Sequence, residues 1–322
     1  MLVITNYIQI TLNLSLMFIF IYKLYFLKLK SRYLDRLYVR IIVRVINILM
    51  PLYFRLSAPF YNLRKKSFVK DDDLFIVSLT SFPARINKVW LSIETIFHQK
   101  VKPDRIILWL FKDEFSGIPS LPKELLTLER RGLEIRFCDK NLMPHKKYFY
   151  TMQEFPNANV ITVDDDMLYP PNLIEKLIKY HNQYPDSIIC TITRQIKAER
   201  STILPYREWS YKKTNSKPDS RNLTMGGGGT LFPPYSLDMN VFDIEALKNF
   251  ALKADDLWLK IMSLKKQTKV VSIAGEYPRL YIPIIQKQNV RLMDSNIGAG
   301  QNDKIFENLM KHYQIPISIF EK

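Results

Sequence analysis

The chain is poor in two residue types that often mark a functional site. It has 322 residues but only two cysteines, Cys138 and Cys190, and neither belongs to a C-x-x-C pair. Both lie in apolar, strand-like runs, so we interpret them as reduced, buried thiols rather than as a disulfide or a zinc site. Glycine is also scarce, with nine residues, and four of them form one run, Gly226 to Gly229. This run is not a P-loop, because no Gly-Lys-Ser/Thr follows it.

Acidic residues are nearly absent from the first 70 positions, which hold one acid and twelve Lys/Arg. The remaining positions hold 35 basic and 30 acidic residues, so most of the net charge of +16 is N-terminal. A nucleic-acid-binding protein usually carries its basic patch on the folded domain, interleaved with aromatic residues. The distribution here indicates no nucleic-acid partner, and it favours an anionic membrane surface.

The N-terminal segment has two parts. Residues 2–22 carry no charge and are long enough to span a bilayer, which takes about 20 residues. No basic residue precedes this run and no small-residue cleavage site follows, so it is not typical of a secretory signal. Four arginines at intervals of four then share one face of an expected helix, which Pro51 should end or kink: Arg32, Arg36, Arg40 and Arg44.

This second helix is typical of one that lies in the lipid headgroup layer. The alternative is a solvated arginine face on a helix packed against the main domain. Whether residues 2–22 span the membrane or lie flat stays open.

Beyond residue 70, short apolar runs alternate with amphipathic stretches. The expected strands are 73–82, 104–111, 133–139, 157–166 and 187–193, and the expected helices are 87–99, 121–132, 146–155 and 171–185. Such alternation predicts an α/β fold with a mostly parallel sheet and helices on both faces. We therefore expect a membrane-associating segment over 1–70 and one catalytic domain over 71–322.

Three consecutive aspartates, Asp164, Asp165 and Asp166, follow the fourth expected strand. Ligands of such sheets bind outside the carboxyl ends of the strands. Side chains alternate along a strand, so Asp164 and Asp166 are expected to point the same way and to hold Mn²⁺ or Mg²⁺ with a diphosphate. One alternative is a polar strand exit. Another is a phosphatase-like nucleophile, which Leu168 weakens because that pattern requires Thr or Val there.

Two further features carry less weight alone. Asp255 and Asp256 begin an amphipathic stretch, where either one could cap a helix or act as a general base. The glycine run is either a flexible linker or a place where the backbone approaches a ligand or must move.

Together these residues resemble the GT-A fold glycosyltransferases, close to the family 2-like enzymes of bacterial surface polysaccharide synthesis (capsule, O-antigen or lipooligosaccharide). The resemblance covers roughly residues 73–313 and excludes the N-terminal segment. It is carried by "FIVSLTSFPARI", "VITVDDDMLYPP", "GGGGTLFPP" and "ADDLWL", and "IGAGQNDKIFENLMKHY" is similar to the terminal segment of that group. The fold it implies is a Rossmann-like, mostly parallel sheet with helices on both faces.

The resemblance implies metal-dependent transfer of a sugar, of hexosyl type, from a nucleotide-diphosphate donor to an acceptor hydroxyl. The donor is most often a uridine nucleotide sugar, and the acceptor a glycan or a lipid-linked molecule. Asp166 and Asp164 would bind Mn²⁺ or Mg²⁺, and Asp256, favoured over Asp255, would be the base of an inverting reaction. Donor contacts would come from the strand ends, the glycine run and nearby side chains: Thr80, Ser81, Arg85, Asp139, Lys146, Lys147, Asp164, Asp165, Gly227 and Gly228.

No Q-x-x-R-W stretch follows the acidic pair, unlike in processive synthases, so we expect one sugar to be added per encounter. The expected location is the cytoplasmic face of the inner cell membrane, with an anchored or peripheral N-terminus. The alternatives are a membrane-anchored, non-catalytic scaffold of an assembly complex, a nucleotide-sugar hydrolase, and a nucleotidyltransferase. The last would need a glycine-rich, lysine-containing first loop, which "SLTSFPARI" lacks.

Overall fold

The structure is a computed structural model, and it describes residues 2–63, 74–279, 281–286 and 300–321, without the side chains of residues 2–8 and 10–12. Within these ranges, seven strands form one sheet in the order β13-β6-β12-β4-β1-β2-β3. The strands are β1 (Phe75–Thr80), β2 (Arg105–Phe111), β3 (Leu133–Cys138), β4 (Asn159–Thr162), β6 (Ile188–Cys190), β12 (Thr230–Phe232) and β13 (Val270–Ser272). All neighbours pair in parallel except β12, which is antiparallel to both β4 and β6.

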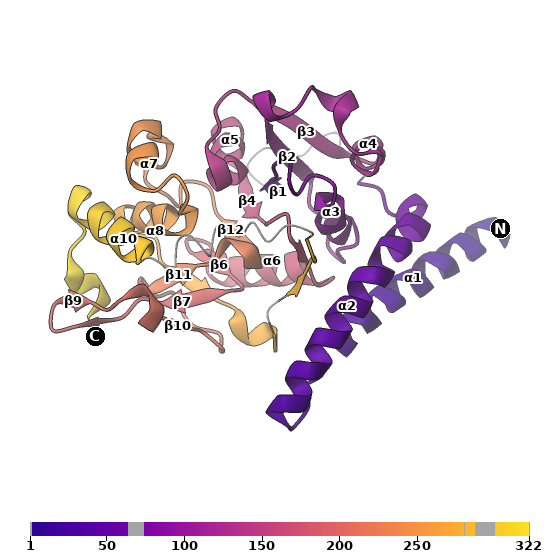
Figure 1. Cartoon of the computed structure of the whole chain (residues 1–322), viewed down its shortest axis with the longest axis horizontal. Helices are drawn as coiled ribbons and strands as arrows, with labels where there is room; N and C mark the ends of the chain where they lie inside the picture. The colour runs from indigo at the N-terminus through magenta and orange to yellow at the C-terminus, as the bar shows by residue number, and fades with distance from the viewer. Residues whose placement is uncertain (1, 64–73, 280, 287–299, 322) are drawn as a thin grey trace.

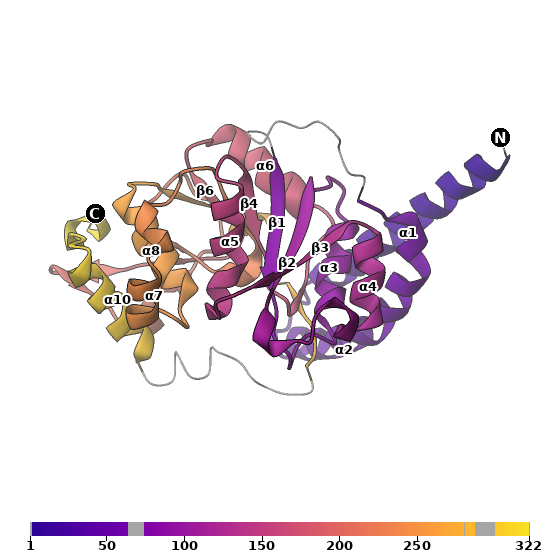
Figure 2. The same ribbon diagram turned by 90° about the horizontal axis from the view of Figure 1, so that it is seen from above.

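Both faces of this sheet are covered, which is why its strands are apolar along their whole length. On one face, Val77 and Leu79 of β1 share a core with α3 (Val89–Phe97), α4 (Lys123–Arg130) and α6 (Leu173–Gln183). On the other face, α5 (Lys146–Glu154) packs over β1, β2 and β4. A second core joins α5 to α7 (Ile244–Phe250), α8 (Asp255–Lys265) and α10 (Gln301–His312). Figures 1 and 2 show α10 at one end of the molecule and the N-terminal helices at the other.

Short strands complete the described fold. They are β5 (Met167–Leu168), β7 (Thr193–Gln195), β8 (Ala198–Glu199), β9 (Thr202–Ile203), β10 (Ser210–Tyr211), β11 (Asn222–Thr224) and β14 (Ile282–Pro283). They pair as β10-β7-β11, β14-β5 and β8-β9.

The predicted α/β class with a mostly parallel sheet is confirmed. The predicted bounds of two strands were wrong. The fourth strand ends at Thr162, so the three aspartates lie beyond it, and the fifth expected strand is divided into β6 and β7. The reason is local: β6 pairs with the main sheet, whereas β7 pairs with β10 and β11 in a separate sheet.

The N-terminal segment forms two helices, α1 (Leu2–Phe26) and α2 (Arg32–Ser57), which contact each other. Pro51 lies inside α2, and the helix continues to Ser57, so of the two expected effects, an end or a kink, the end does not occur. Met50, Tyr53 and Phe54 are buried in the same core as α3. The tertiary packing of this face outweighs the backbone hydrogen bond that the proline removes.

Contacts with the main domain extend along the whole of α2. Asp35, near its start, forms an ion pair with Arg279, and Asn47 donates from Nδ2 to the carbonyl of Pro283 at 3.0 Å. At its end, Ser57 Oγ lies 2.9 Å from His98 Nε2. The boundary predicted after residue 70 lies outside the described residues and stays a prediction.

Candidate active site

The three aspartates form a tight turn between β4 and β5. Ser92 Oγ of α3 lies within hydrogen-bond distance of the carbonyl oxygens of Asp164 (2.8 Å) and Met167 (2.7 Å), can donate its one proton to either, and so closes this turn. Tyr169, fully buried, accepts a hydrogen bond from the Asp164 amide at 2.7 Å and donates to the Gly227 carbonyl at 3.1 Å. Because the residues are not in a strand, the alternation that predicted the directions of Asp164 and Asp166 does not apply to them.

Asp165 is held by residues that follow β1. Its two carboxylate oxygens accept from Ser81 Oγ at 2.6 Å and from Arg85 Nη1 at 2.7 Å. The same Arg85 nitrogen lies 3.0 Å from Asp166 Oδ2. Burial raises the pKa of Asp165, and Arg85 and Ser81 oppose that effect. Asp165 therefore orients the turn, and Arg85 joins it to Asp166.

Lys147 connects the two acidic motifs. Its side chain is buried, and its Nζ lies 2.8 Å from Asp164 Oδ1 and 2.8 Å from Asp255 Oδ2. Burial opposes the charge on this lysine, but Asp164, Asp255 and Asp256 outweigh burial and raise its pKa well above the usual value. Two acidic pairs about 90 residues apart in the sequence thus meet at one buried cation.

The glycine run lies against this cluster. Gly226 to Gly228 form a single 3₁₀ turn, and the Gly226 amide donates to Asp256 Oδ1 at 2.8 Å. A Cβ at Gly226 would lie 2.7 Å from Lys147 Nζ, and one at Gly227 would lie 3.2 Å from Asp164 Oδ2. The run is therefore not a linker: it brings backbone close to the charged side chains, where a larger residue would collide.

The two members of the second acidic pair differ in their electrostatics. Burial raises the pKa of both carboxyls, but for Asp255 the ion pair with Lys147 outweighs burial and holds the pKa below its usual range. For Asp256, burial and the charge of Asp255 together raise the pKa well above its usual range. Environments that separate the pKa values of neighbouring carboxyls are typical of acid–base sites.

The residues present fit a divalent cation that binds together with a diphosphate. In the described part of the chain, no three His, Cys, Asp or Glu side chains form a ready-made metal site. However, among the described residues, five carboxylates lie together with two cationic side chains that form ion pairs with them, Lys147 and Arg85. Burial and the charges of Asp164 and Asp165 raise the pKa of Asp166 to about 6. Such an excess of negative charge suits a hard cation held by one or two carboxylates and substrate phosphates.

Within the described residues, four predicted donor contacts form no hydrogen bond or ion pair with these aspartates. Thr80 Oγ1 donates to the Trp109 carbonyl at 2.8 Å, within the sheet. Asp139 is largely exposed and forms an ion pair with Lys112 at 2.7 Å. Gly228 has no room for a Cβ, which would lie 2.5 Å from Ile192. Lys146 is buried at the start of α5 with its Nζ 3.3 Å from Asn141 Oδ1, and burial lowers its pKa.

Sequence reasoning missed three residues that build the site: Ser92, His145 and Tyr169. His145 is buried, its Nε2 lies 2.9 Å from the Ala251 carbonyl, and burial lowers its pKa to about 4. The ring is therefore neutral and fixes the loop before α8. The position of Tyr169, just after the aspartates in "DDDMLY", was the one available signal.

Comparison with known proteins gives one family match. Residues 92–237, a little under half of the chain, match the family described as "Glycosyl transferase family 2". The matched stretch contains the three aspartates, Lys147 and the glycine run, but not Asp255 and Asp256. The match supports the glycosyltransferase resemblance drawn from the sequence. No curated protein sequence matches the chain.

Three solved structures are similar to the chain at low identity. GalNAc-T7 with UDP, GalNAc and Mn²⁺ is 11% identical over 63% of this chain and 42% of its own, with a TM-score of 0.41. S. aureus TarS 1-349 is 8% identical over 65% of this chain and 59% of its own, with a TM-score of 0.38. The mannosyltransferase PcManGT from Pyrobaculum calidifontis, in complex with GDP-Man and Mn²⁺, is 11% identical over 87% and 82%, with a TM-score of 0.40. The chain thus spans less than two thirds of the length of the first two.

Proposed function

We propose that this protein is a glycosyltransferase that moves a sugar from a nucleotide-diphosphate donor to an acceptor hydroxyl. The observation that carries the proposal is the meeting of two distant acidic motifs on either side of buried Lys147, beneath a run of glycines. The family match over residues 92–237 supports the same class of reaction.

In the proposed reaction, Asp256 is the base. It takes the proton of the acceptor hydroxyl as that oxygen attacks the anomeric carbon. The new carbon–oxygen bond forms as the bond to the diphosphate breaks, which gives an inverted glycoside and a nucleoside diphosphate. Asp256 suits this role better than Asp255, because its pKa is raised, whereas Asp255 is committed to the ion pair with Lys147.

Asp164 and Asp166 would hold Mn²⁺ or Mg²⁺, which when bound neutralises charge on the leaving diphosphate. Arg85 and Lys147 set the positions of these two carboxylates through their ion pairs. The glycine backbone can lie close to Asp164 and Lys147 because Gly226 and Gly227 carry no side chain, and Gly227 is a proposed donor contact. Ser81 and Lys146 are proposed donor contacts next to this cluster, and Thr80, Asp139 and Gly228 remain proposals.

The experiment that tests this reaction is isothermal titration of UDP and GDP into the full chain, with and without Mn²⁺. We expect metal-dependent binding of one nucleotide, and we propose UDP. Asp166→Ala should abolish the metal dependence, and the exposed carboxylate variant Glu245→Gln should bind like the wild type. If neither nucleotide binds the folded protein, the hypothesis of a non-catalytic scaffold replaces that of an enzyme.

We further propose that the N-terminal helices hold the protein on an anionic membrane surface. The face of α2 opposite its buried side is an apolar stripe, in which every side chain is at least 40% exposed. Its members are Leu34, Leu37, Ile41, Val45, Ile48, Leu49, Leu52 and Leu56. Arg36, Arg40 and Arg44 are exposed along one flank of this stripe, where they would meet lipid phosphates.

The packing of α2 favours a position in the plane of the membrane surface over one across it. In the described chain, the one helix long and apolar enough to cross a membrane is α2, as Arg32–Phe60. However, its contacts to Arg279, Pro283 and His98 bind it to the main domain along its length. If α2 crossed the membrane, these polar contacts would have to lie in lipid, which costs several kcal/mol for each polar group left without a partner. The first expected span, 2–22, lies partly outside the described side chains.

Vesicle sedimentation tests this part of the proposal. We expect binding to vesicles that contain phosphatidylglycerol, weaker binding at high salt, and little binding to pure phosphatidylcholine. The double variant Ile48→Ser/Leu52→Ser should lose binding, whereas Met239→Ser, at a position 73% exposed and far from α2 in sequence, should not. If all variants bind vesicles equally, the exposed stripe of α2 does not contact the membrane.

The finer biological role follows from these two proposals. Nucleotide sugars are cytoplasmic, so the catalytic domain would lie at the cytoplasmic face of the inner membrane and act on a glycan or lipid-linked acceptor of surface polysaccharide synthesis. Holding the site at that surface raises the effective concentration of a membrane-bound acceptor. Release of free sugar with no acceptor product would identify a hydrolase instead.

A further inference from the structure

One polar side chain interrupts the apolar surface of α2 beside its exposed stripe. Between Val45 and Pro51, Asn47 is the one residue that is not apolar. A leucine would match its branched shape, form helix more readily and enlarge the apolar surface. Neither the helix nor the proposed membrane contact therefore accounts for an asparagine, and its hydrogen bonds to the main domain give the reason.

Those hydrogen bonds lead to β14, a short strand that lies against the turn with the three aspartates. The two residues of β14 pair antiparallel with β5, the strand that begins directly after Asp166. The residue that follows β14, Ile284, donates from its amide to the Asp166 carbonyl at 2.8 Å. β14 and Ile284 therefore fix the backbone of the residue whose carboxylate is proposed to bind the metal.

Asn47 pairs with the other edge of this segment. Its Nδ2 donates to the Pro283 carbonyl at 3.0 Å, and its Oδ1 accepts from the Ile285 amide at 2.8 Å. Backbone groups of successive residues in a strand point to alternate edges, so Ile284 faces Asp166 while the residues on either side of it face α2. A carboxamide has both the donor and the acceptor that this edge requires. Asn47 thus takes the place of a third strand.

The supported strand is weak by itself. β14 has two residues and its sheet has two strands, and so small a sheet needs support from neighbouring elements to be stable. The Lys88 ammonium contacts the Ile285 carbonyl and provides part of that support. The two hydrogen bonds from Asn47 provide another part, and they come from a helix that the main core holds in place through Met50, Tyr53 and Phe54.

The other end of the aspartate turn is held independently of β14. Ser92 and Tyr169 bind the backbone of Asp164, as described above. Loss of the Asn47 carboxamide should therefore loosen the backbone at Asp166 and leave Asp164 and the main sheet in place. Such a loss would be seen in metal binding before it is seen in the stability of the fold.

We propose that Asn47 is a positioning residue of the metal site, which holds Asp166 in place through β14. The inference rests on the proposed function, because it takes Asp166 as a ligand of Mn²⁺ or Mg²⁺. It makes α2, which lies outside the family match over residues 92–237, part of the support of the site. The next residue, Ile48, is 74% exposed in the proposed membrane contact, so adjacent residues of α2 serve the membrane and the site.

Mn²⁺ titration of the full chain, followed by electron paramagnetic resonance, tests this inference. The titration is made with excess UDP, and with GDP in parallel, in the absence of vesicles. We expect Asn47→Leu to raise the Kd for Mn²⁺ about ten-fold, the usual effect of losing a residue that orients a metal ligand. Asn47→Asp keeps the acceptor for Ile285 but turns a carboxylate oxygen to the Pro283 carbonyl, so it should weaken binding as well.

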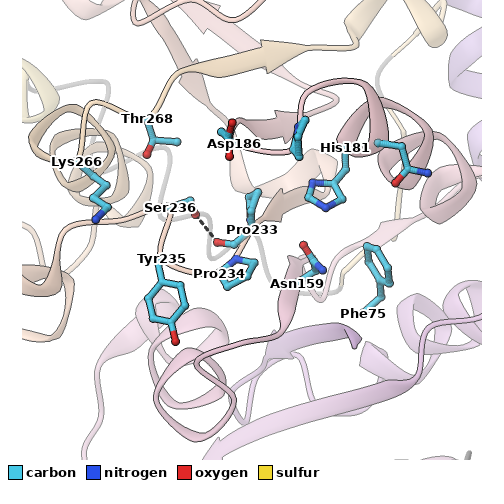
Figure 3. Close-up of a pocket in the computed structure, with 12 residues that line it drawn as sticks. Phe75, Asn159, His181, Asp186, Pro233, Pro234, Tyr235, Ser236, Lys266 and Thr268 are labelled. Atoms are coloured by element: carbon cyan, nitrogen blue, oxygen red, sulfur yellow. Dashed lines mark hydrogen bonds between the residues drawn. The ribbon is translucent and has the colours of Figure 1, made fainter. Parts of the chain in front are cut away.

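The matched control is the same substitution on another helix. Asn182 is exposed on α6 and lines a cavity of about 570 Å³, shown in Figure 3. Phe75 and Asn159, which begin β1 and β4, also line this cavity, so it lies at the opposite end of β4 from the aspartates. Asn182→Leu should therefore bind Mn²⁺ like the wild type.

Melting temperature and vesicle sedimentation separate positioning from a general structural role. Asn47→Leu should keep the melting temperature and the vesicle binding of the wild type. The inference is overturned if Asn47→Leu binds Mn²⁺ like the wild type, if Asn182→Leu weakens binding equally, or if affinity falls only in variants with a lowered melting temperature. If the wild type binds no Mn²⁺ with either nucleotide, the proposed function fails, and this inference fails with it.

Discussion

Replacement of Lys147 by methionine should separate the two acidic motifs that this lysine holds together. Methionine keeps the unbranched apolar stem and removes the charge. Asp164 and Asp255, each 2.8 Å from Nζ, would then face each other and Asp256 without a cation. Loss of one partner from a buried ion pair costs about 3–5 kcal/mol. For a chain of this size, that loss corresponds to a fall in melting temperature of roughly 4–7 °C.

The assay is urea unfolding of the full chain at neutral pH and at about pH 5, where shifted carboxyls begin to protonate. Without the lysine, the pKa values of Asp255 and Asp256 rise, so the loss of stability should be larger at neutral pH than at pH 5. Nucleotide binding should fall as well, because Asp164 loses its fixed position.

Lys260 provides the matched control. It is equally buried, on α8, but its Nζ contacts the carbonyl of Ser220, and burial lowers its pKa to about 7. Lys260→Met removes a charge that the fold accommodates poorly, so its stability should match or exceed that of the wild type. A deficit below about 1 kcal/mol in Lys147→Met, or the same deficit in both variants, would refute the account of Lys147 as the link between the motifs.

Three further outcomes follow from the structure. Gly226→Ala places a Cβ 2.7 Å from the buried lysine and should cost about 1–3 kcal/mol in urea unfolding together with most of the transfer activity; full activity would contradict the close approach. Burial lowers the pKa of His98 to about 3 and of His145 to about 4, so below about pH 6.5 the unfolded chain binds protons that the folded chain does not. The free energy of unfolding should therefore fall by about 2 kcal/mol per histidine on acidification to about pH 5. His98→Gln should make the free energy of unfolding depend less on pH in this range. Glu94→Ala leaves a buried arginine unpaired and should cost about 3–5 kcal/mol, whereas Glu124→Ala, which breaks a pair with an exposed arginine, should stay within about 1 kcal/mol; equal losses would contradict the difference in burial.

Much of the fold was predictable because hydrophobic periodicity reports burial. The runs at 104–111 and 133–139 are buried on a covered sheet and became β2 and β3 almost without change. Pro51 shows the limit of such local rules. Its cost is a single backbone bond, and the burial of Met50, Tyr53 and Phe54 around it outweighs that cost. The exposed stripe of α2 could not be separated from its buried face in sequence, since both faces are apolar.

The residues of the candidate site could be predicted from their types, but the ion pairs and hydrogen bonds between them could not. Runs of aspartate and glycine are costly in a folded domain, and the combination of Asp164–Asp166, Asp255–Asp256 and Gly226–Gly229 in one chain, rather than any of them alone, marked these residues as functional candidates. The distance from Lys147 to each aspartate, the single arginine shared by Asp165 and Asp166, and the tyrosine beneath the turn depend on how α5, α8 and β4 pack together.

The sequence by itself determined the order of strands and helices between residues 73 and 193, the basic, apolar N-terminus and the residue types of the site, because local spacing and composition specify each of them. Only the tertiary structure decided which carboxylates share a cation and that β12 runs antiparallel to both of its neighbours. These features join residues far apart in the chain, and their energies depend on distance and burial, which no local pattern specifies.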